Sequence, residues 1–109
     1  ALTVAQELDR RQLLFNVQQR GEQLRDGLSQ RVAKWPRLLS GERGWGLIQG
    51  LLLRDGVITA AELVKAAMAE ALLLVPAGPQ VVRFVPPLVI TGRELNKALH
   101  RLDLALAKF

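Results

Sequence analysis

One arginine stands among apolar residues in the segment VVRFVPPL, Val81 to Leu88, and its side chain is suited to binding an anion. In an extended strand side chains alternate between the two faces, so Arg83 would share its face with Val81 and Val85. A guanidinium in such a place must reach water or meet an anion, and its planar fork matches a carboxylate bidentately. We therefore predict a carboxylate site at Arg83. The alternative is an edge strand from which Arg83 extends into solvent.

The single histidine, His100, is the next candidate for chemistry, because Asp103 follows it by about one helical turn and could pair with it. A catalytic triad also needs a positioned nucleophile, and the sequence shows no serine or cysteine in a strand-to-helix loop. We therefore expect His100 to be a surface or structural residue. The sequence also offers no pair of carboxylates for acid–base chemistry, since Glu62 and Glu94 are explained by helix capping.

The glycines of GERGWGLIQG, Gly41 to Gly50, resemble a phosphate-binding loop only superficially. That fingerprint requires a strand before the glycines and a helix after them, whereas a strand is predicted to follow here. Without cysteine the chain cannot form a thiolate zinc site or a disulfide framework. We therefore predict no catalytic residue, no cofactor-binding residue and no metal ligand in this chain.

Helices are predicted from capping boxes, in which the first cap residue and a Glu or Gln three residues later satisfy the free backbone donors. A short helix is also expected in Leu2 to Leu8. The capped helices begin with NVQQ at Asn16, TAAE at Thr59 and TGRE at Thr91, and they end near Trp35, Leu72 and Leu106.

The segments between these helices have an extended character. WGLIQGLLLRDG predicts one strand that ends at the Asp55–Gly56 turn, and LLLVPAGPQVVRFV predicts two strands joined by PAGP. Pro86 and Pro87 then stop the last strand. The resulting order of helix, helix, strand, helix, strand, strand and helix indicates an α+β fold, a small three-stranded sheet with helices packed on it.

Composition limits the classes of protein that remain. The chain has 109 residues, half of them apolar, which is enough for one domain with a modest core. The net charge of +5 is dispersed among acidic residues, so we expect no nucleic-acid partner. We also expect no membrane span, no secretory signal and a cytoplasmic location. The absence of an initiator Met leads us to expect a fragment.

The runs RGWGLIQGLLL and ALLLVPAGPQVVRFVPPLVIT resemble the C-terminal part of the class III, pyridoxal-phosphate-dependent aminotransferases, most closely the acetylornithine aminotransferases. The resemblance covers nearly the whole chain. It implies that residues 1–109 are the C-terminal small domain of a fold type I enzyme, whose large cofactor-binding domain is absent from this chain. Ala71 departs from the pattern, because the family usually has a glycine there.

The resemblance also implies a role for Arg83. In the family the arginine of the VVRF strand projects into the active site and holds the α-carboxylate of the substrate. The parent reaction would be transamination from N-acetylornithine to 2-oxoglutarate in arginine biosynthesis. The Schiff-base lysine and the pyridoxal phosphate site would lie in the large domain, so the isolated chain is expected to bind no cofactor and to be inactive. A second subunit, forming a homodimer, is implied as well.

Other functions remain open from the sequence. Ornithine, succinylornithine and 4-aminobutyrate aminotransferases share this small domain. A free-standing module that binds a carboxylate at Arg83 without catalysis is the alternative from a different class.

Overall fold

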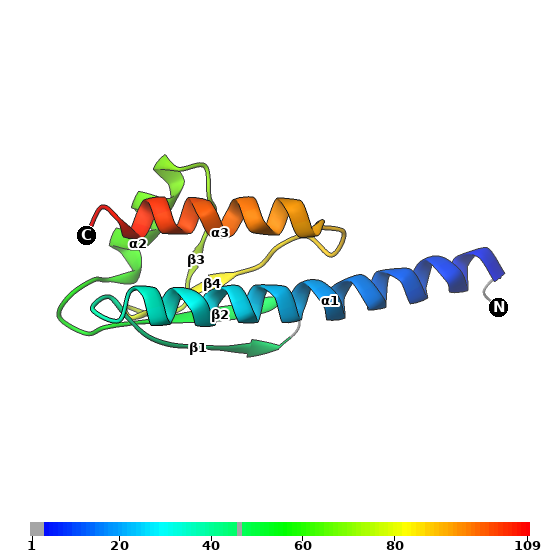
Figure 1. The fold of residues 1–109 in the computed structure, drawn as a ribbon, viewed down its shortest axis with the longest axis horizontal. Helices are drawn as coiled ribbons and strands as arrows, with labels where there is room; N and C mark the ends of the chain where they lie inside the picture. Colours follow the sequence, from blue (N-terminus) through cyan, green and yellow to red (C-terminus); the bar gives the residue numbers. More distant parts are fainter. Residues whose placement is uncertain (1–3, 46) are drawn as a thin grey trace.

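The computed structural model describes the backbone of residues 4–45 and 47–109 and the side chains of residues 10–44 and 47–109. Figure 1 shows helices packed on an antiparallel sheet, as the predicted α+β class requires. In chain order the elements are α1 (Val4–Lys34), β1 (Leu39–Trp45), β2 (Ile48–Leu53), α2 (Ala60–Ala69), β3 (Val75–Pro76), β4 (Val81–Phe84) and α3 (Gly92–Leu106).

The sheet has four strands in the order β1-β2-β4-β3, one more than the three predicted. The additional strand is β1, which forms a hairpin with β2 in which Trp45 lies opposite Ile48. Its sequence, LSGERGW, contains two glycines and two charged residues, which are poor strand formers. It forms a strand because β2 offers a partner. Gly44 permits the tight hairpin, since its φ is +154° and a Cβ there would overlap the Ile48 carbonyl oxygen.

The first helix is continuous, so the predicted break before a capped start at Asn16 is wrong. Asn16 lies inside α1, and its Nδ2 donates hydrogen bonds to the carbonyl oxygens of Leu88 at 2.9 Å and Ile90 at 3.1 Å. The side chain thus holds the loop between β4 and α3 rather than capping a helix. The predicted end near Trp35 is confirmed, and Figure 1 shows the N-terminal part of α1 extending beyond the other elements. Leu2 and Thr3, at the start of the expected short helix, lie outside the described residues.

The other two capping boxes are confirmed at Thr59 and Thr91. At α3, hydrogen bonds from the Thr91 side chain and backbone lower the pKa of the Glu94 carboxyl, with a smaller contribution from Lys97. The range of α3 agrees with the prediction, whereas α2 ends at Ala69, before the expected Leu72. It ends there because Ala71 adopts a left-handed φ of 60°.

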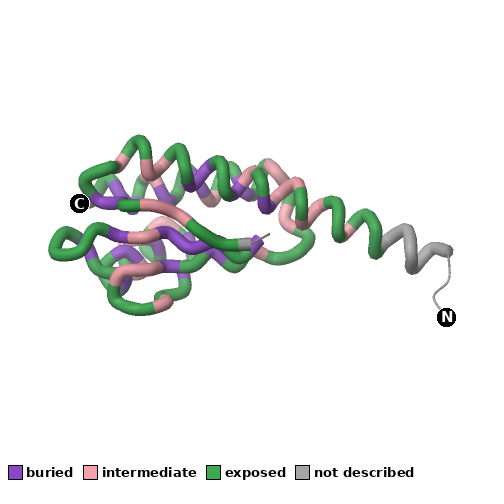
Figure 2. The backbone as a smooth tube through the Cα atoms, turned by 90° about the horizontal axis from the view of Figure 1, so that it is seen from below, coloured by how far each residue is buried: buried purple, intermediate pink, exposed green. Residues whose placement is uncertain are grey.

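Helices α1 and α2 pack on the sheet, α3 packs on both of these helices, and all three bury apolar residues in one core. Figure 2 shows the buried residues gathered between the helices and the strands. Helices α1 and α3 approach closely at Gly27, where a Cβ would overlap the Leu99 side chain. The core includes Leu24, Leu28, Leu51, Leu63, Val82, Phe84, Leu95 and Leu102. The opposite face of the sheet, here called the outer face, keeps exposed side chains such as Ile48 and Val75.

Within the described residues, no helix combines the length and the apolar character that crossing a membrane would need. The long helix α1 is predominantly polar.

Candidate functional site

Arg83 lies on β4, in the middle of the sheet between β2 and β3. It is directly opposite Gly50 on β2 and Val75 on β3. The alternative explanation, an edge strand with an arginine extending into water, is therefore wrong about the strand. Arg83 is exposed because no helix in the described part of the chain covers the outer face, not because its strand is at an edge.

The neighbouring residues on β4 fix the direction of the Arg83 side chain. Val82 and Phe84 are buried in the core, so the residues that alternate with them point to the outer face. Arg83 shares that face with Val81, as its position in the sequence predicts, whereas Val85 lies beyond the end of the strand. The strand ends at Phe84, before the two prolines.

The outer face forms a groove of about 610 Å³ around Arg83. Strands β1, β2 and β4 and the turn after β3 contribute its walls. The residues that line it are Arg43, Gly44, Ile48, Gly50, Ala77, Val81 and Arg83. This set combines a short apolar surface with two guanidinium groups.

The Arg83 guanidinium makes no hydrogen bond and no ion pair with any described residue. Among the residues that the structure describes, no carboxylate lines the groove around it. Its five N–H donors are therefore available to a ligand, and their fork geometry favours a carboxylate. The arrangement can bind and orient an anionic group, but the described residues that line it include no nucleophile and no general base.

Arg43 is the groove residue that sequence reasoning missed. It lies on β1, which was not predicted, and it is exposed on the same outer face as Arg83. Only the pairing of β1 with β2 places Arg43 near Arg83. The motif RGWGL contains Arg43, but nothing in the sequence indicates that Arg43 lies on the same face of the sheet as Arg83.

His100 and Asp103 do not form the pair that their spacing allows. His100 is exposed on α3, where it borders a shallow hollow of about 700 Å³ with Arg93, Asn96, Lys97 and Arg101. Asp103 instead turns towards the C-terminal end of α1. Across the described residues, no group of three or more histidine, aspartate or glutamate side chains could hold a metal ion.

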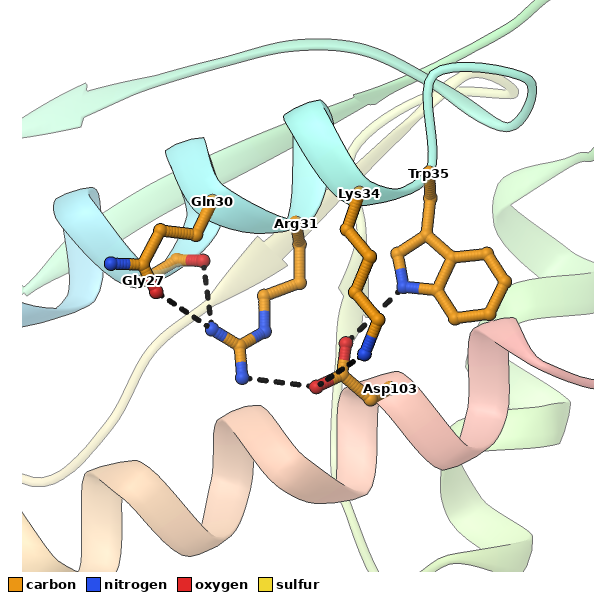
Figure 3. A network of polar contacts seen from close by, with 6 residues as sticks. All are labelled: Gly27, Gln30, Arg31, Lys34, Trp35 and Asp103. Atoms are coloured by element: carbon orange, nitrogen blue, oxygen red, sulfur yellow. Dashed lines mark hydrogen bonds and ion pairs between the residues drawn. The ribbon is translucent and has the colours of Figure 1, made fainter.

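Asp103 joins α3 to α1 through a network of polar contacts (Figure 3). Its Oδ2 accepts a hydrogen bond from Arg31 Nη2 at 3.0 Å and lies 3.8 Å from Lys34 Nζ. Its Oδ1 accepts a hydrogen bond from Trp35 Nε1 at 3.2 Å. Arg31 also donates to the carbonyl oxygen of Gly27. The network holds α1 and α3 together and lies outside the Arg83 groove.

A sequence model of the family described as "Aminotransferase class-III" matches residues 1–106. Among curated proteins, the acetylornithine aminotransferase of Nostoc sp. is 60% identical over 98% of this chain and 25% of its own length. The acetylornithine aminotransferase of Thermosynechococcus vestitus is 56% identical over 98% of this chain and 26% of its own length. The chain thus spans about a quarter of the length of these relatives.

Solved structures of aminotransferases are also similar to this chain. The N-acetylornithine aminotransferase of Stenotrophomonas maltophilia superimposes with a TM-score of 0.82 and 35% identity, covering 90% of this chain and 27% of that protein. The lysine aminotransferase of M. tuberculosis superimposes with a TM-score of 0.81 and 29% identity, covering 93% of this chain and 23% of that protein.

Proposed function

The chain belongs to the class III aminotransferase family, and from this membership we propose that it is the C-terminal small domain of an acetylornithine aminotransferase. In this proposal Arg83 binds a substrate carboxylate. The observation that carries it is the Arg83 guanidinium, which has no partner among the described residues and lies on an open groove whose described lining contains no carboxylate. The acetylornithine specificity is supported by the names of relatives that are 50% to 60% identical to the chain.

The parent enzyme would transfer an amino group from N-acetylornithine to 2-oxoglutarate. Pyridoxal phosphate, when bound, supplies the electron sink for this chemistry. The groove does not fit the cofactor's Schiff base, because no lysine lines it. The lysines lie on the helices or after α3, at Lys34, Lys65, Lys97 and Lys108. We therefore assign the cofactor site to the part of the parent enzyme outside this chain.

Arg83 would contribute by orientation. A carboxylate held by both arms of a guanidinium is fixed in position and in rotation, so that the reacting carbon is presented in one geometry. The rigidity of β4 helps, because the strand is paired on both sides and its alternate residues are buried. The large domain, a second subunit in a homodimer and a cytoplasmic location complete the proposal, and their support is family membership alone.

The test is Arg83→Lys in the full-length enzyme. Lysine keeps the charge but loses the fork, so we expect a loss of about 1.5 to 3 kcal/mol in carboxylate binding. This corresponds to a decrease of roughly 10- to 150-fold in kcat/KM. Arg93→Lys is the matched control, because Arg93 is exposed on α3 and does not line the groove. An unchanged kcat/KM for both N-acetylornithine and 2-oxoglutarate would refute the assignment of Arg83.

A further inference from the structure

We propose that the exposed side of α3 binds a chain of phosphate groups, either a free inorganic one or that of a nucleotide. The site is the shallow hollow of about 700 Å³ that His100 borders, here called the α3 hollow. The residues that line it are Arg93, Asn96, Lys97, His100 and Arg101. The inference goes beyond the proposed function, because none of these residues lines the Arg83 groove.

The spacing of the basic residues gathers them on one side of the helix. Arg93, Lys97 and Arg101 follow one another at intervals of four residues, and residues four apart are neighbours on a helix surface. At a rise of about 1.5 Å per residue, their Cα atoms form a row about 12 Å long. Asn96 and His100 come three residues after Arg93 and Lys97, so they border the same row. The row therefore offers a linear ligand several contacts in succession.

This side of α3 faces away from the rest of the fold. The residues that α3 buries in its packing on α1 and α2 are four leucines and one alanine on the other side of the helix. All five residues that line the α3 hollow are exposed to solvent. In Figure 1, α3 runs along one side of the molecule and β1 along the other. Because the Arg83 groove lies on the outer face of the sheet, beyond the core, ligands of the two sites would not compete for space.

The lining of the α3 hollow presents mainly hydrogen-bond donors. Arginine and lysine side chains only donate, and an imidazole always offers at least one N–H. Asn96 has an acceptor, but its Oδ1 already accepts a hydrogen bond from Gln23 Nε2 at 2.9 Å, which leaves the Nδ2 donor for a ligand. Arg101 Nη1 donates to the carbonyl oxygen of Ala71 at 3.3 Å, which helps to fix the position of this guanidinium. The α3 hollow thus favours a ligand rich in acceptors.

The carboxylates of α3 are engaged away from the α3 hollow. Glu94 accepts hydrogen bonds from the backbone and side chain of Thr91 at the start of the helix. Asp103 accepts hydrogen bonds from Arg31 and Trp35 on the α1 side. Among the residues that the structure describes, none that lines the α3 hollow is acidic. Its lining therefore has three cations and no anion to balance them.

A chain of phosphates fits this arrangement better than a single carboxylate. Every phosphate in a chain carries negative charge and acceptor oxygens, so successive groups can meet successive cations along the row. Arginine binds a phosphate through two parallel N–H donors, whereas lysine binds it as a point charge. A volume of about 700 Å³ also has room for a small molecule of this kind.

The test is a calorimetric titration of inorganic triphosphate into the full-length, cofactor-loaded enzyme at fixed ionic strength. We expect the double variant Lys97→Gln/Arg101→Gln to weaken binding about tenfold. The matched control is Lys65→Gln/Arg25→Gln, which removes one exposed lysine and one exposed arginine outside the α3 hollow. It should change the dissociation constant by less than about twofold. Equal weakening in the two double variants would reveal an effect of overall charge and would overturn the proposal, as would the absence of binding to the unsubstituted enzyme.

Two further titrations locate the site and identify the source of the phosphates. Arg83→Gln should leave the binding of triphosphate unchanged. If it weakens binding as much as the α3 double variant does, the phosphates bind in the Arg83 groove and the proposal is refuted. ATP is compared with triphosphate: similar dissociation constants would show that the phosphate chain alone is recognised, and tighter binding of ATP would identify a nucleotide. In either case the α3 double variant must weaken both ligands.

Discussion

Asp103 is predicted to be the polar side chain whose removal most weakens the packing of α3 on α1. Asp103→Ala would delete the acceptor of two hydrogen bonds and two ion pairs at once, those to Arg31, Lys34 and Trp35 (Figure 3). The Asp103 side chain is only 15% exposed and that of Arg31 only 17%. Solvent can therefore replace the lost contacts only in part.

The expected loss can be estimated contact by contact. A hydrogen bond to a charged acceptor contributes about 1.5 to 3 kcal/mol, which applies to the bond from Trp35. The partly buried pair with Arg31 adds to this, whereas the pair with Lys34 is mostly exposed and adds less than about 1 kcal/mol. These contributions share one carboxylate and do not add fully. We expect Asp103→Ala to reduce the free energy of unfolding by about 2 to 4 kcal/mol.

Urea unfolding of the 109-residue chain, followed by far-ultraviolet circular dichroism, measures this loss. With a slope of about 1 to 2 kcal/mol per molar urea, the midpoint should fall by roughly 2 M. Asp103→Asn keeps an acceptor for Trp35 and should lie between the wild type and Asp103→Ala. Glu70→Gln is the matched control, because the Glu70–Lys108 pair has the same 3.0 Å distance but greater exposure, and it should cost less than about 1 kcal/mol.

The reasoning would be refuted if Asp103→Ala cost no more than the Glu70 control. It would also be refuted if Asp103→Asn were as damaging as Asp103→Ala, because the hydrogen bond from Trp35 would then contribute nothing.

Two more predictions concern the helix ends. Ala71→Gly should raise the free energy of unfolding by about 1 kcal/mol in the same urea assay. The reason is that Ala71 has a φ of 60°, which glycine adopts without strain. An unchanged or lower urea midpoint would contradict this explanation. The pKa of the Glu94 carboxyl is lowered, first by the hydrogen bonds with Thr91. The ionised carboxylate therefore stabilises the fold. This contribution is complete above the ordinary pKa of a glutamate and is lost as the pH falls through the lowered pKa. Thr91→Ala should therefore reduce the urea midpoint at neutral pH more than at strongly acidic pH, and an equal effect at both would exclude the carboxylate as the cause.

The features that could be predicted from the sequence are those that depend on neighbouring residues. The caps at Thr59 and Thr91 were predicted because both partners of a capping box lie three residues apart. The end of β4 was also predicted from its neighbours in the sequence, because Pro86 and Pro87 follow it closely. Arg83 was singled out because its type contrasts with its apolar neighbours, and its carboxylate-binding role stays a prediction. None of these inferences needs to know how distant segments meet.

The features that could not be predicted depend on distant partners. NVQQ at Asn16 satisfies the pattern of a capping box, yet the Asn16 amide donates to Leu88 and Ile90, which belong to a loop far away in the sequence. The strand β1 likewise has a composition that disfavours strands and forms only against β2. In both places a long-range contact overrides the local preference.

The same distinction explains why one arginine of the groove was found and the other was not. The chemistry of a guanidinium can be read at any position, but its neighbours on a sheet are set by strand order and register. Arg43 and Arg83 share a row only because β2 separates β1 from β4 and because both arginines pair with Gly50. A register shift of one residue in β1 would move Arg43 to the face that packs on the helices. The pair of guanidiniums in the groove is therefore a property of the topology, because no local sequence pattern brings Arg43 and Arg83 together.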